Sequence, residues 1–576
     1  MRFSFAIIGG GLTGVSMIFQ LVKRIRQKAR SGQLDPSKIN IQMFEKQSVF
    51  GPGFPHSENN ALPCHIINMC AQDMGIISAN PGDFQNWADS HRESIYNHYR
   101  AFFNESDLRQ DCCDYYPRPV MGEYLKSRFG EAIEKARQLG LGLELYSRCE
   151  VTNLLEENSR VRLTFKNFNT GKRFSIHSDR ALIATGHWLD HEERDHFFPS
   201  PWPPKTLVEG IPTGESVAII GTSLSALDAT LALTAEGEFH RDAKGVLTYV
   251  PASNPRNIRL YSRRGLLPRI RGKTGDYKNR FLTLENVEKL TIENNGMLSL
   301  ETIFHLLESD LEAAYGHRIE WTKILNPTAS PIQLLKADIK DAKQGDGHNG
   351  ALLRQTVLHR TLPFVRKLYT SLSAADRKRF DKKYATLFFS HASAIPLING
   401  EKLLALMKSG TVDVVKLGDP YRFIKDASRG DYEFVYRTEQ GMKKRRRHKY
   451  VIDARGQKKS YETNPSELAQ NLLRSGTIQI EELPYLNHPE SHDHMTEDPD
   501  GGIRIYRTGG MWIDPDTHHV VRKGIDGKKS ISERIYAVGA MTRGQIIDAS
   551  MAHASAVSTD KIAESLTGFL EKTQSR

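Results

Sequence analysis

Six residues close to the N-terminus, Gly9-Gly10-Gly11-Leu12-Thr13-Gly14, have the GxGxxG spacing of a phosphate-binding turn. They follow the apolar run 3–8 and precede apolar residues at helical spacing, so they join a strand to a helix. In such a turn the first glycine permits the bend, the second lets a pyrophosphate reach the backbone, and the third lets the helix pack closely. The helix N-terminus offers free N–H groups to the phosphates. The pattern predicts a dinucleotide site formed by Gly9, Gly11, Thr13 and Gly14.

A carboxylate follows the next apolar strand, which spans residues 40–44 and ends in Glu45. There it can accept hydrogen bonds from ribose hydroxyls, and it would repel a 2′-phosphate. FAD or NAD therefore fits the first site better than NADP. A glycine-rich structural turn is the alternative, but the strand, the helix and the acidic residue in register favour the dinucleotide.

The order of strand, turn and helix returns at residues 216–233. The turn Gly221-Thr222-Ser223-Leu224-Ser225-Ala226 carries small residues where glycine would be strictest, and these still allow a close approach. Two arginines follow the next strand, where an arginine can pair with a 2′-phosphate. We expect NADPH, in preference to NADH, to bind Gly221, Ser223, Ser262, Arg263 and Arg264. An arginine loop in solvent is the alternative.

The five cysteines, Cys64, Cys70, Cys112, Cys113 and Cys149, are an odd number without CxxC spacing. This argues against a disulfide framework and a zinc site, and it implies a reducing compartment. Cys64 and Cys70 raise the question of a disulfide reductase, but five residues separate them instead of four, which favours two small buried residues. No GxSxG nucleophile motif is present, so a bound cofactor must carry the chemistry.

Two such nucleotide-binding units predict an α/β fold with two Rossmann-like dinucleotide-binding domains, for FAD and NAD(P), and a mostly helical insertion. We expect the first part of the FAD-binding domain at 1–210, the NAD(P)-binding domain at 211–275 and a substrate-related helical insertion at 276–410. Residues 411–576 are expected to complete the FAD-binding domain, with a strand at 534–538 and a helix from about Ala549 to Leu566.

Composition describes an ordinary globular protein, with 39% hydrophobic and 26% charged residues. No run of about twenty apolar residues is present, so we expect no membrane partner. The N-terminal apolar run is interrupted by glycines and lacks a cleavage site, which favours a cytoplasmic location. The net charge of +11 attracts anions without choosing among them.

The basic run Lys443-Lys444-Arg445-Arg446-Arg447-His448-Lys449 suggests nucleic acid as a partner. A solvated hairpin edge that discourages strand-to-strand aggregation explains the run more simply, so nucleic acid is disfavoured. The oligomeric state is left open.

Taken together these segments resemble the FAD-NAD(P)-binding protein family, related to the two-dinucleotide flavoprotein monooxygenases. The resemblance implies a flavin on the first domain, a nicotinamide coenzyme on the second and a substrate cleft between them. Some similar enzymes hydroxylate the nitrogen of an amino acid or amine. Beyond the glycine turn, it rests on Phe50-Gly51-Pro52-Gly53-Phe54, residues 67–74 and 117–125, Ala184-Thr185-Gly186, residues 262–268, Tyr536-Ala537-Val538-Gly539 and Thr542-Arg543-Gly544.

The resemblance also assigns residues to the flavin and the cleft. It implies that Gly186, Gly539 and the start of the final helix at Asp548 lie near the flavin, although Ala540 stands where disulfide-reducing relatives have aspartate. Asn68, flanked by His65, is a candidate to face flavin or substrate because its family counterpart lies beside the isoalloxazine. His187 follows Gly186 directly and is a candidate for the cleft. For either histidine, a core or surface role is favoured over a catalytic one.

Two further segments carry open interpretations. Arg118, held between Pro117 and Pro119, is a candidate anion-binding side chain or a structural ion pair. Asp453-Ala454-Arg455-Gly456 resembles a second crossover of the Ala184-Thr185-Gly186 type, with arginine in place of threonine.

We therefore expect an FAD-dependent, NADPH-using monooxygenase that hydroxylates a small amine or amino acid. An acidic substrate or other anion would suit the positive charge. A flavin reductase or dehydrogenase without productive oxygen chemistry is one alternative. A non-catalytic FAD-binding regulatory scaffold is another.

Overall fold

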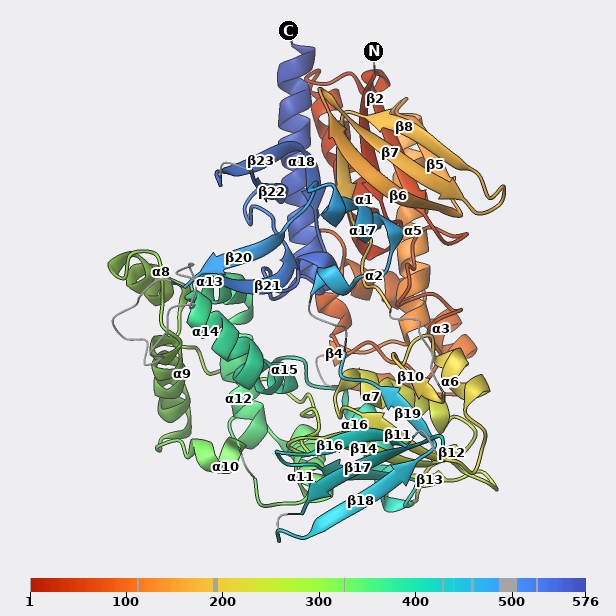
Figure 1. The fold of residues 1–576 in the computed structure, drawn as a ribbon, viewed down its shortest axis with the longest axis vertical. Helices are drawn as coiled ribbons and strands as arrows, with labels where there is room; N and C mark the ends of the chain where they lie inside the picture. Colours follow the sequence, from red (N-terminus) through yellow and green to blue (C-terminus); the bar gives the residue numbers. More distant parts are fainter. Residues whose placement is uncertain are drawn as a thin grey trace.

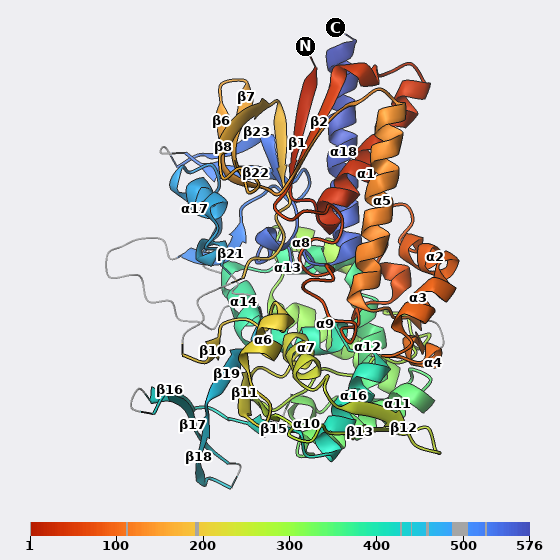
Figure 2. The same cartoon turned by 90° about the vertical axis from the view of Figure 1, so that its right-hand side faces the viewer.

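The structure is a computed structural model that describes residues 2–110, 113–189, 195–325, 327–426, 429–438, 440–456, 460–485, 505–524 and 527–575. Two sheets, one mainly parallel with an antiparallel edge strand and one wholly parallel, lie at opposite ends of the molecule, with helices between and beside them (Figures 1 and 2). None of the helices in these ranges is long and apolar enough to cross a membrane.

The first sheet has the strand order β22-β23-β9-β1-β2-β5. Strand β1 pairs in parallel with β2 and β9, and the C-terminal β23 pairs in parallel with β9. The C-terminal segment therefore completes the sheet that the N-terminus begins. The strands are β1 (Phe3–Ile8), β2 (Ile39–Glu45), β5 (Gly142–Ser147), β9 (Arg180–Ile183), β22 (His519–Lys523) and β23 (Lys529–Ala537).

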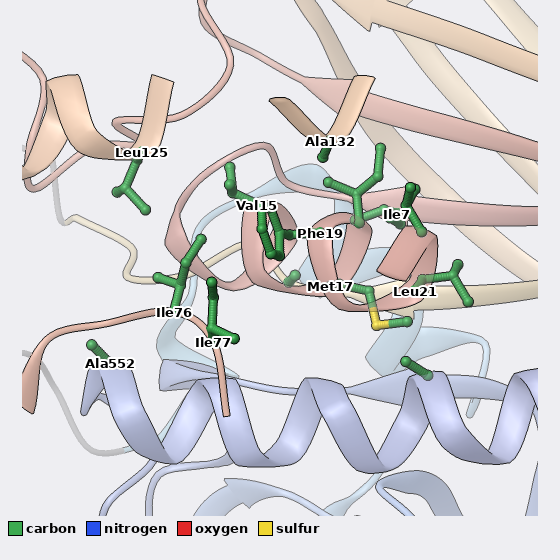
Figure 3. Packing of buried hydrophobic residues seen from close by; sticks show 14 of the residues in the cluster. Ile7, Val15, Met17, Phe19, Leu21, Ile76, Ile77, Leu125, Ala132 and Ala552 are labelled. Carbon is green, nitrogen blue, oxygen red and sulfur yellow. The ribbon is translucent and has the colours of Figure 1, made fainter. Parts of the chain in front are cut away.

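Helix α1 (Leu12–Arg30) packs on β1 and lies between α18 (Ala552–Gln574) and α5 (Arg118–Gln138) (Figure 3). Val15 and Met17 of α1 are fully buried in the same cluster as Ile7 of β1. Burial of these apolar side chains drives the helix onto the sheet.

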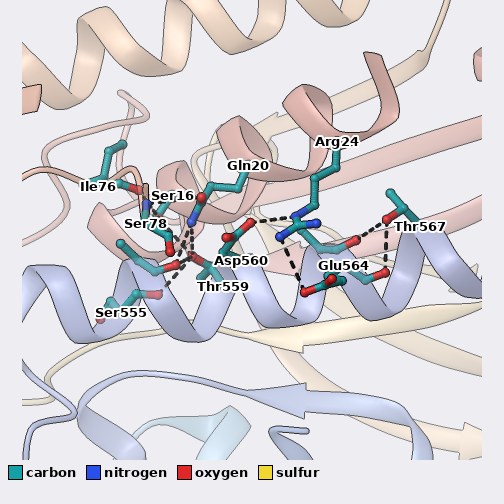
Figure 4. Close-up of polar contacts among 12 residues, drawn as sticks. Ser16, Gln20, Arg24, Ile76, Ser78, Ser555, Thr559, Asp560, Glu564 and Thr567 are labelled. Carbon is teal, nitrogen blue, oxygen red and sulfur yellow. Dashed lines mark hydrogen bonds and ion pairs between the residues drawn. The ribbon is translucent and has the colours of Figure 1, made fainter. Parts of the chain in front are cut away.

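Polar side chains also join the first and last helices (Figure 4). Ser16 and Thr559 share a hydrogen bond of 2.8 Å between their hydroxyls, and Arg24 donates to the Asp560 carboxylate at 2.7 Å. All four side chains lie on the facing surfaces of α1 and α18, so these contacts fix the register of the two helices.

The second sheet has the order β10-β19-β11-β14-β15, and all of its pairings are parallel. Helix α7 (Leu224–Leu233) follows β11, as the sequence predicts. Strands β15 and β19 fall in the range 411–576 that the sequence analysis assigned to the first domain, yet they pair with β14 and β11. The short apolar patterns of β15 and β19 indicate that these segments are strands, but they do not indicate which sheet the strands join. The strands are β10 (Phe197–Phe198), β11 (Ser216–Ile220), β14 (Asn257–Ser262), β15 (Val412–Lys416) and β19 (Tyr450–Asp453).

The basic run forms β18 (Lys443–His448) at the edge of a three-stranded antiparallel sheet with β16 (Arg422–Asp426) and β17 (Asp431–Arg437). Residues 443–447 are exposed, and the ring of His448 is buried. The interpretation of this run as a hairpin edge is confirmed.

The region expected to be helical carries nine named helices within the described residues. Leu403 and Leu406 of α16 pack with Ile219 of the second sheet, so the end of this region covers that sheet. The helices are α8 (Leu284–Glu293), α9 (Leu300–Tyr315), α10 (Trp321–Leu325), α11 (Pro331–Gln344), α12 (Gly350–His359), α13 (Val365–Thr370), α14 (Ala374–Arg379), α15 (Ala385–Ala392) and α16 (Leu397–Lys408).

Smaller elements surround the two sheets. Strands β6, β7 and β8 form an antiparallel sheet beside the first parallel sheet, and the rest are short hairpins and helices. They are β3 (Arg109–Gln110), β4 (Cys113–Asp114), β6 (Cys149–Glu157), β7 (Arg160–Asn167), β8 (Arg173–Ser178), β12 (Glu238–Arg241), β13 (Leu247–Val250), β20 (Ile480–Pro484), β21 (Ile505–Met511), α2 (Asp83–Ser90), α3 (Arg92–Tyr99), α4 (Glu105–Leu108), α6 (Pro204–Gly210) and α17 (Glu467–Arg474).

Candidate functional site

The first glycine turn lies where β1, β9 and α1 meet. Gly9 has a φ of +115°, and a Cβ atom on it would lie 2.3 Å from the carbonyl oxygen of Ala184 at the end of β9. A Cβ atom on Gly14 would lie 1.9 Å from the carbonyl oxygen of Gly9. These distances leave room only for glycine. Helix α1 begins without a side-chain cap on Gly11, so its first N–H groups are open to an anion.

Two distant segments close around this turn. A Cβ atom on Gly11 would lie 3.2 Å from the Cα atom of Gly53, in the Phe50–Phe54 segment. A Cβ atom on Gly539, which has a φ of +108°, would lie 3.5 Å from the hydroxyl oxygen of Thr13. The end of β23 therefore reaches the start of α1, as the resemblance implies for a flavin site.

Glu45 lies at the carboxyl end of β2 and is 6% exposed. One carboxylate oxygen accepts the Gly10 N–H at 2.8 Å, and the other accepts the Gln47 N–H at 2.8 Å. Burial raises the pKa of Glu45, and the backbone donors oppose that rise. Each oxygen keeps a lone pair that a ribose hydroxyl could use.

Asp548 and Gly186 occupy different environments. Asp548 lies in a turn four residues before α18 and not, as was expected, at the start of that helix. Its carboxylate forms an ion pair with Arg366 of α13, with an Nε–Oδ1 distance of 3.1 Å, and so ties this turn to the helical insertion. A hollow next to it is lined by Gly539, Thr542 and Ser555. A Cβ atom on Gly186 would meet no atom within 4 Å, so the segment after β9 has an open side.

The second turn repeats the geometry of the first. Gly221 has a φ of +124°, and a Cβ atom on it would lie 2.7 Å from the carbonyl oxygen of Ala454 at the end of β19. The Ala454 carbonyl therefore packs against Gly221 in the same way as the Ala184 carbonyl packs against Gly9. This supports the resemblance of the two crossover segments. Helix α7 begins after Ser223 without a side-chain cap, so its first N–H groups also face outward.

The two arginines after β14 lie exposed at the carboxyl end of the strand. Arg263 and Arg264 form no ion pair within the described part of the chain. The hydroxyl of Ser262 accepts the Gly265 N–H at 3.0 Å and so holds the turn that presents them. The geometry leaves both guanidinium groups available to an anion.

His65 is fully buried between the two domains, and both ring nitrogens are engaged. The Leu62 N–H donates to Nδ1 at 3.2 Å, and Nε2 donates to the backbone oxygen of Asp228 at 3.1 Å. Burial lowers the pKa of His65 to about 4. These contacts give His65 a structural role at the domain junction and leave no ring nitrogen for a substrate.

Asn68 and His187 keep side chains that could meet a ligand. Asn68 is half-buried, and its amide makes no hydrogen bond within the described residues. His187 retains solvent access, yet desolvation by the surrounding protein lowers its pKa to about 4, with contributions from Arg543 and Arg118.

His56 and Arg543 lie near His187 but were not predicted as site residues. Desolvation lowers the pKa of His56 to about 3, and the charges of Arg118 and His187 add to this effect. Arg543 lies over the Phe389 ring of α15 at 5.9 Å, and burial lowers its pKa. The Thr542-Arg543-Gly544 motif was the available signal. The structure thus brings the imidazoles of His56 and His187 close to the guanidinium groups of Arg118 and Arg543.

Arg118 joins the two domains. It pairs with the Asp228 carboxylate of α7 at 2.7 Å, and its guanidinium lies 4.9 Å from the centre of the Trp202 ring. The side chains of Arg118 and Asp228 are 15% and 8% exposed. Of the two interpretations left open by the sequence, the structural ion pair is the one observed.

The cysteines require a correction, because Cys70 and Cys113 are joined by a disulfide. The expectation of no disulfide was wrong. The Ile67 N–H donates to the Tyr116 oxygen at 3.0 Å, and this backbone pairing brings the two cysteines within a Cα–Cα distance of 5.4 Å. Because 43 residues of sequence separate Cys70 from Cys113, their spacing did not indicate that they would pair. Cys64 and Cys149 are free thiols, and Cys112 lies outside the described residues.

Comparison with known proteins agrees with this geometry. Residues 6–188 match the sequence family described as FAD-NAD(P)-binding. An Escherichia coli (strain K12) protein named YdhS is 27% identical over 474 residues, which cover 79% of this chain and 83% of YdhS.

Two solved structures share the fold over nearly the whole chain. Reduced ornithine hydroxylase (PvdA) from Pseudomonas aeruginosa is 12% identical, with a TM-score of 0.50 and coverage of 99% of this chain and 100% of that one. FAD-bound DfoA, a cadaverine monooxygenase from Erwinia amylovora, is 14% identical, with a TM-score of 0.51 and coverage of 99% and 95%. The chain therefore contains an FAD-NAD(P)-binding domain, set in a two-sheet α/β fold like that of these two enzymes.

Proposed function

We propose that this protein is an FAD- and NADPH-dependent monooxygenase that hydroxylates a small amine or amino acid. The observation that carries the proposal is the repeated turn geometry. Gly9 abuts Ala184 and Gly221 abuts Ala454, so one chain offers two dinucleotide cradles on two parallel sheets. The full-length likeness to an ornithine hydroxylase and a cadaverine monooxygenase supports amine hydroxylation as the use of those cradles.

The residues of the first cradle fit FAD. The N–H groups at the start of α1 would hold the pyrophosphate, and Gly11 would let it reach the backbone. Glu45 would accept hydrogen bonds from the ribose hydroxyls. Thr13 and Gly539, which lie close together, would contact the rest of the cofactor. Bound FAD would supply the redox chemistry by accepting a hydride from NADPH and then reducing oxygen.

The residues of the second cradle fit NADPH. The start of α7 at Ser223 and Leu224 would hold the pyrophosphate. Arg263 and Arg264 are exposed beyond β14 and would pair with a 2′-phosphate. That pairing would distinguish NADPH from NADH.

The side chains around His187 suit an amine substrate. An amine must lose its proton before its nitrogen lone pair can accept oxygen. The positive charges of Arg118 and Arg543 disfavour an ammonium group nearby, so an amine would bind there as the free base, and the neutral imidazole of His187 could accept a hydrogen bond from its N–H. Asn68 would orient the substrate through its amide, which makes no hydrogen bond within the described residues.

An anaerobic titration tests the proposal. The purified protein should show the absorbance spectrum of bound flavin, and NADPH should bleach it faster than NADH. With air restored, oxygen uptake should rise in the presence of an amine or amino acid, with less hydrogen peroxide formed per NADPH.

Two outcomes would favour the alternatives. Reduction of an added acceptor without any oxygenated product would indicate a flavin reductase or dehydrogenase. Retention of FAD without turnover by either coenzyme would indicate a regulatory scaffold. A flavin spectrum unchanged by NADPH would contradict the monooxygenase.

A further inference from the structure

A short extended segment beyond the second sheet enters the helical insertion between α12 and α15. The Arg269 N–H donates to Ser390 at 3.1 Å, and the Arg271 N–H donates to Ile395 at 2.8 Å. Ile270 packs into the core of the second domain. Because side chains alternate along an extended chain, Arg269 and Arg271 both point away from that core, toward the insertion.

Arg271 is a buried guanidinium with neutral partners. Its side chain spans α12 and α15, donating to Nε2 of His359 at 2.8 Å and to the backbone oxygen of Ala392 at 3.3 Å. Arg271 is 8% exposed, and its Nε–H finds no acceptor among the described residues. The Nε–H group of this buried guanidinium is therefore available to donate a hydrogen bond to a ligand.

Arg354 is a second guanidinium with neutral hydrogen-bond partners, and its side chain is half-buried. It projects from α12, donates to the Tyr315 hydroxyl at 3.0 Å and lies 3.4 Å from Nε2 of His391. Nδ1 of His391 lies 3.2 Å from the Leu387 oxygen, so Nδ1 carries the proton and Nε2 accepts from Arg354.

The histidines do not neutralise the two arginines. Burial lowers the pKa of His359 to about 4 and that of His391 to about 3, and the neighbouring guanidinium groups lower both further. Both imidazoles are therefore neutral near pH 7. They satisfy single N–H donors without supplying negative charge.

The carboxylates nearby are fewer than the guanidinium groups. Asp338 pairs with Arg269 at 3.3 Å and also interacts electrostatically with Arg354, and the charge of Asp341 acts on Arg269. Neither Arg271 nor Arg354 forms an ion pair with a carboxylate in the part of the chain that the structure describes. A buried cation without a counter-ion is costly, so this arrangement calls for an anion from outside the chain.

We propose that Arg271 and Arg354 bind a small oxyanion, the carboxylate or phosphate group of a metabolite, between α12 and α15. Planar guanidinium groups suit such an oxyanion because their N–H groups match its oxygens in pairs. The open Nε–H of Arg271 supplies a donor, and that of Arg269, which also lacks an acceptor among the described residues, supplies another. The site is separate from the glycine turns and does not depend on the proposed reaction.

Anion titrations of the full-length, FAD-loaded protein test the site. Inorganic phosphate and acetate are added at constant ionic strength, with chloride as the reference, and thermal unfolding and binding heats are recorded without NADPH. We expect phosphate, acetate or both to raise the unfolding temperature of the wild type by a few degrees. The response to each anion identifies which of the two groups the site prefers.

Three variants complete the test: Arg271→Gln, Arg354→Gln and, as a control, Arg318→Gln, which changes an exposed arginine of the same insertion. Each of the first two should weaken anion binding by about tenfold or more, and the control should leave it unchanged. In chloride, the first two should unfold at or above the wild-type temperature, since removing a buried cation relieves repulsion.

The contrary outcomes are equally clear. A wild type stabilised no more by phosphate or acetate than by chloride would overturn the proposal. Equal anion binding by all three variants would overturn it too. Unfolding of Arg271→Gln and Arg354→Gln far below the wild type in chloride would show a structural role instead. NADPH oxidation is measured separately, so failure of the monooxygenase proposal would leave these results unaffected.

Discussion

The backbone N–H of Gly10 donates to the Glu45 carboxylate at 2.8 Å, which ties the first glycine turn to the end of the neighbouring strand. Changing Glu45 to Gln places an NH₂ group against one of two backbone donors and removes the charged acceptor for ribose. A hydrogen bond to a charged group contributes about 1.5–3 kcal/mol, so FAD affinity should fall by about 10- to 100-fold. Fluorescence titration of the apoprotein with FAD measures this change.

The matched control for that variant is Glu157→Gln, at the exposed end of β6. It should bind FAD as the wild type does. Equal affinities for Glu45→Gln and wild type would remove Glu45 from the FAD site.

Gly14 has no space for a side chain, because a Cβ atom would lie 1.9 Å from the Gly9 oxygen. Gly14→Ala must displace either the turn or α1, which should cost about 1–3 kcal/mol of unfolding free energy and release FAD on gel filtration. The control Gly130→Ala lies exposed in α5 with nothing within 4 Å, and should stabilise the protein by about 0.5–1 kcal/mol. FAD retention by Gly14→Ala would contradict the assignment of the turn.

His65 should make stability depend on pH. Its pKa is about 4 in the folded protein and about 6.5 when unfolded, so the unfolded state binds more protons between these values. Stability is then present above pH 6.5 and is lost as pH falls toward 4. Between pH 7 and pH 5 this one group should lower the unfolding free energy by about 2 kcal/mol.

Denaturant unfolding of the wild type and His65→Gln at both pH values isolates that contribution. The variant should lose about 2 kcal/mol less than the wild type over this interval. Parallel pH profiles would show that His65 is not held neutral at the junction.

The Arg118–Asp228 pair should be a strong junction contact, since both side chains are mostly buried. Arg118→Gln leaves the Asp228 carboxylate unpaired and should cost about 3–5 kcal/mol of unfolding free energy. Arg118→Gln/Asp228→Asn should recover part of that loss. The exposed pair Lys205–Glu209 is the control, and its Lys205→Gln variant should change stability by less than about 1 kcal/mol.

Arg263 and Arg264 should decide the choice of coenzyme. Replacing both by Ala should raise the KM for NADPH by about 10- to 100-fold and leave that for NADH unchanged, since only NADPH carries the 2′-phosphate. Steady-state flavin reduction measures both values. Lys244→Ala, at an exposed turn of the same domain, should change neither. Equal losses for the two coenzymes would place the arginines elsewhere on the nucleotide.

Local sequence was sufficient for the two turns and for much of the fold. Helix α7 has the predicted bounds, and β1 does as well. Such elements can be predicted because a short apolar run, small turn residues and helical spacing all lie within one stretch of about thirty residues. Strands β15 and β19 could also be recognised as strands. The sheet that they join could not be predicted, because their pairing partners lie far away in the chain.

The side chains of the site depended on distant contacts in the same way. His65 was a candidate catalytic residue for which a core or surface role was favoured, and the structure shows the core role, because the backbone oxygen of Asp228, 163 residues away, engages its ring. Cys70 was expected to be a free thiol, but Cys113 lies beside it. Neither His56 nor Arg543 stood out as a site residue until the fold placed both near His187.

The sequence by itself thus determined the positions of the two turns that we propose as dinucleotide sites, because the strand, the small turn residues and the helix of each lie within one short stretch of the chain. Tertiary structure alone decided which polar side chains are free and which are paired. Burial, hydrogen bonding and ion pairing arise from residues that only folding brings together. For this reason the position of Glu45 at the end of a strand could be predicted from the sequence. The lack of a carboxylate partner for Arg271 and Arg354 could not.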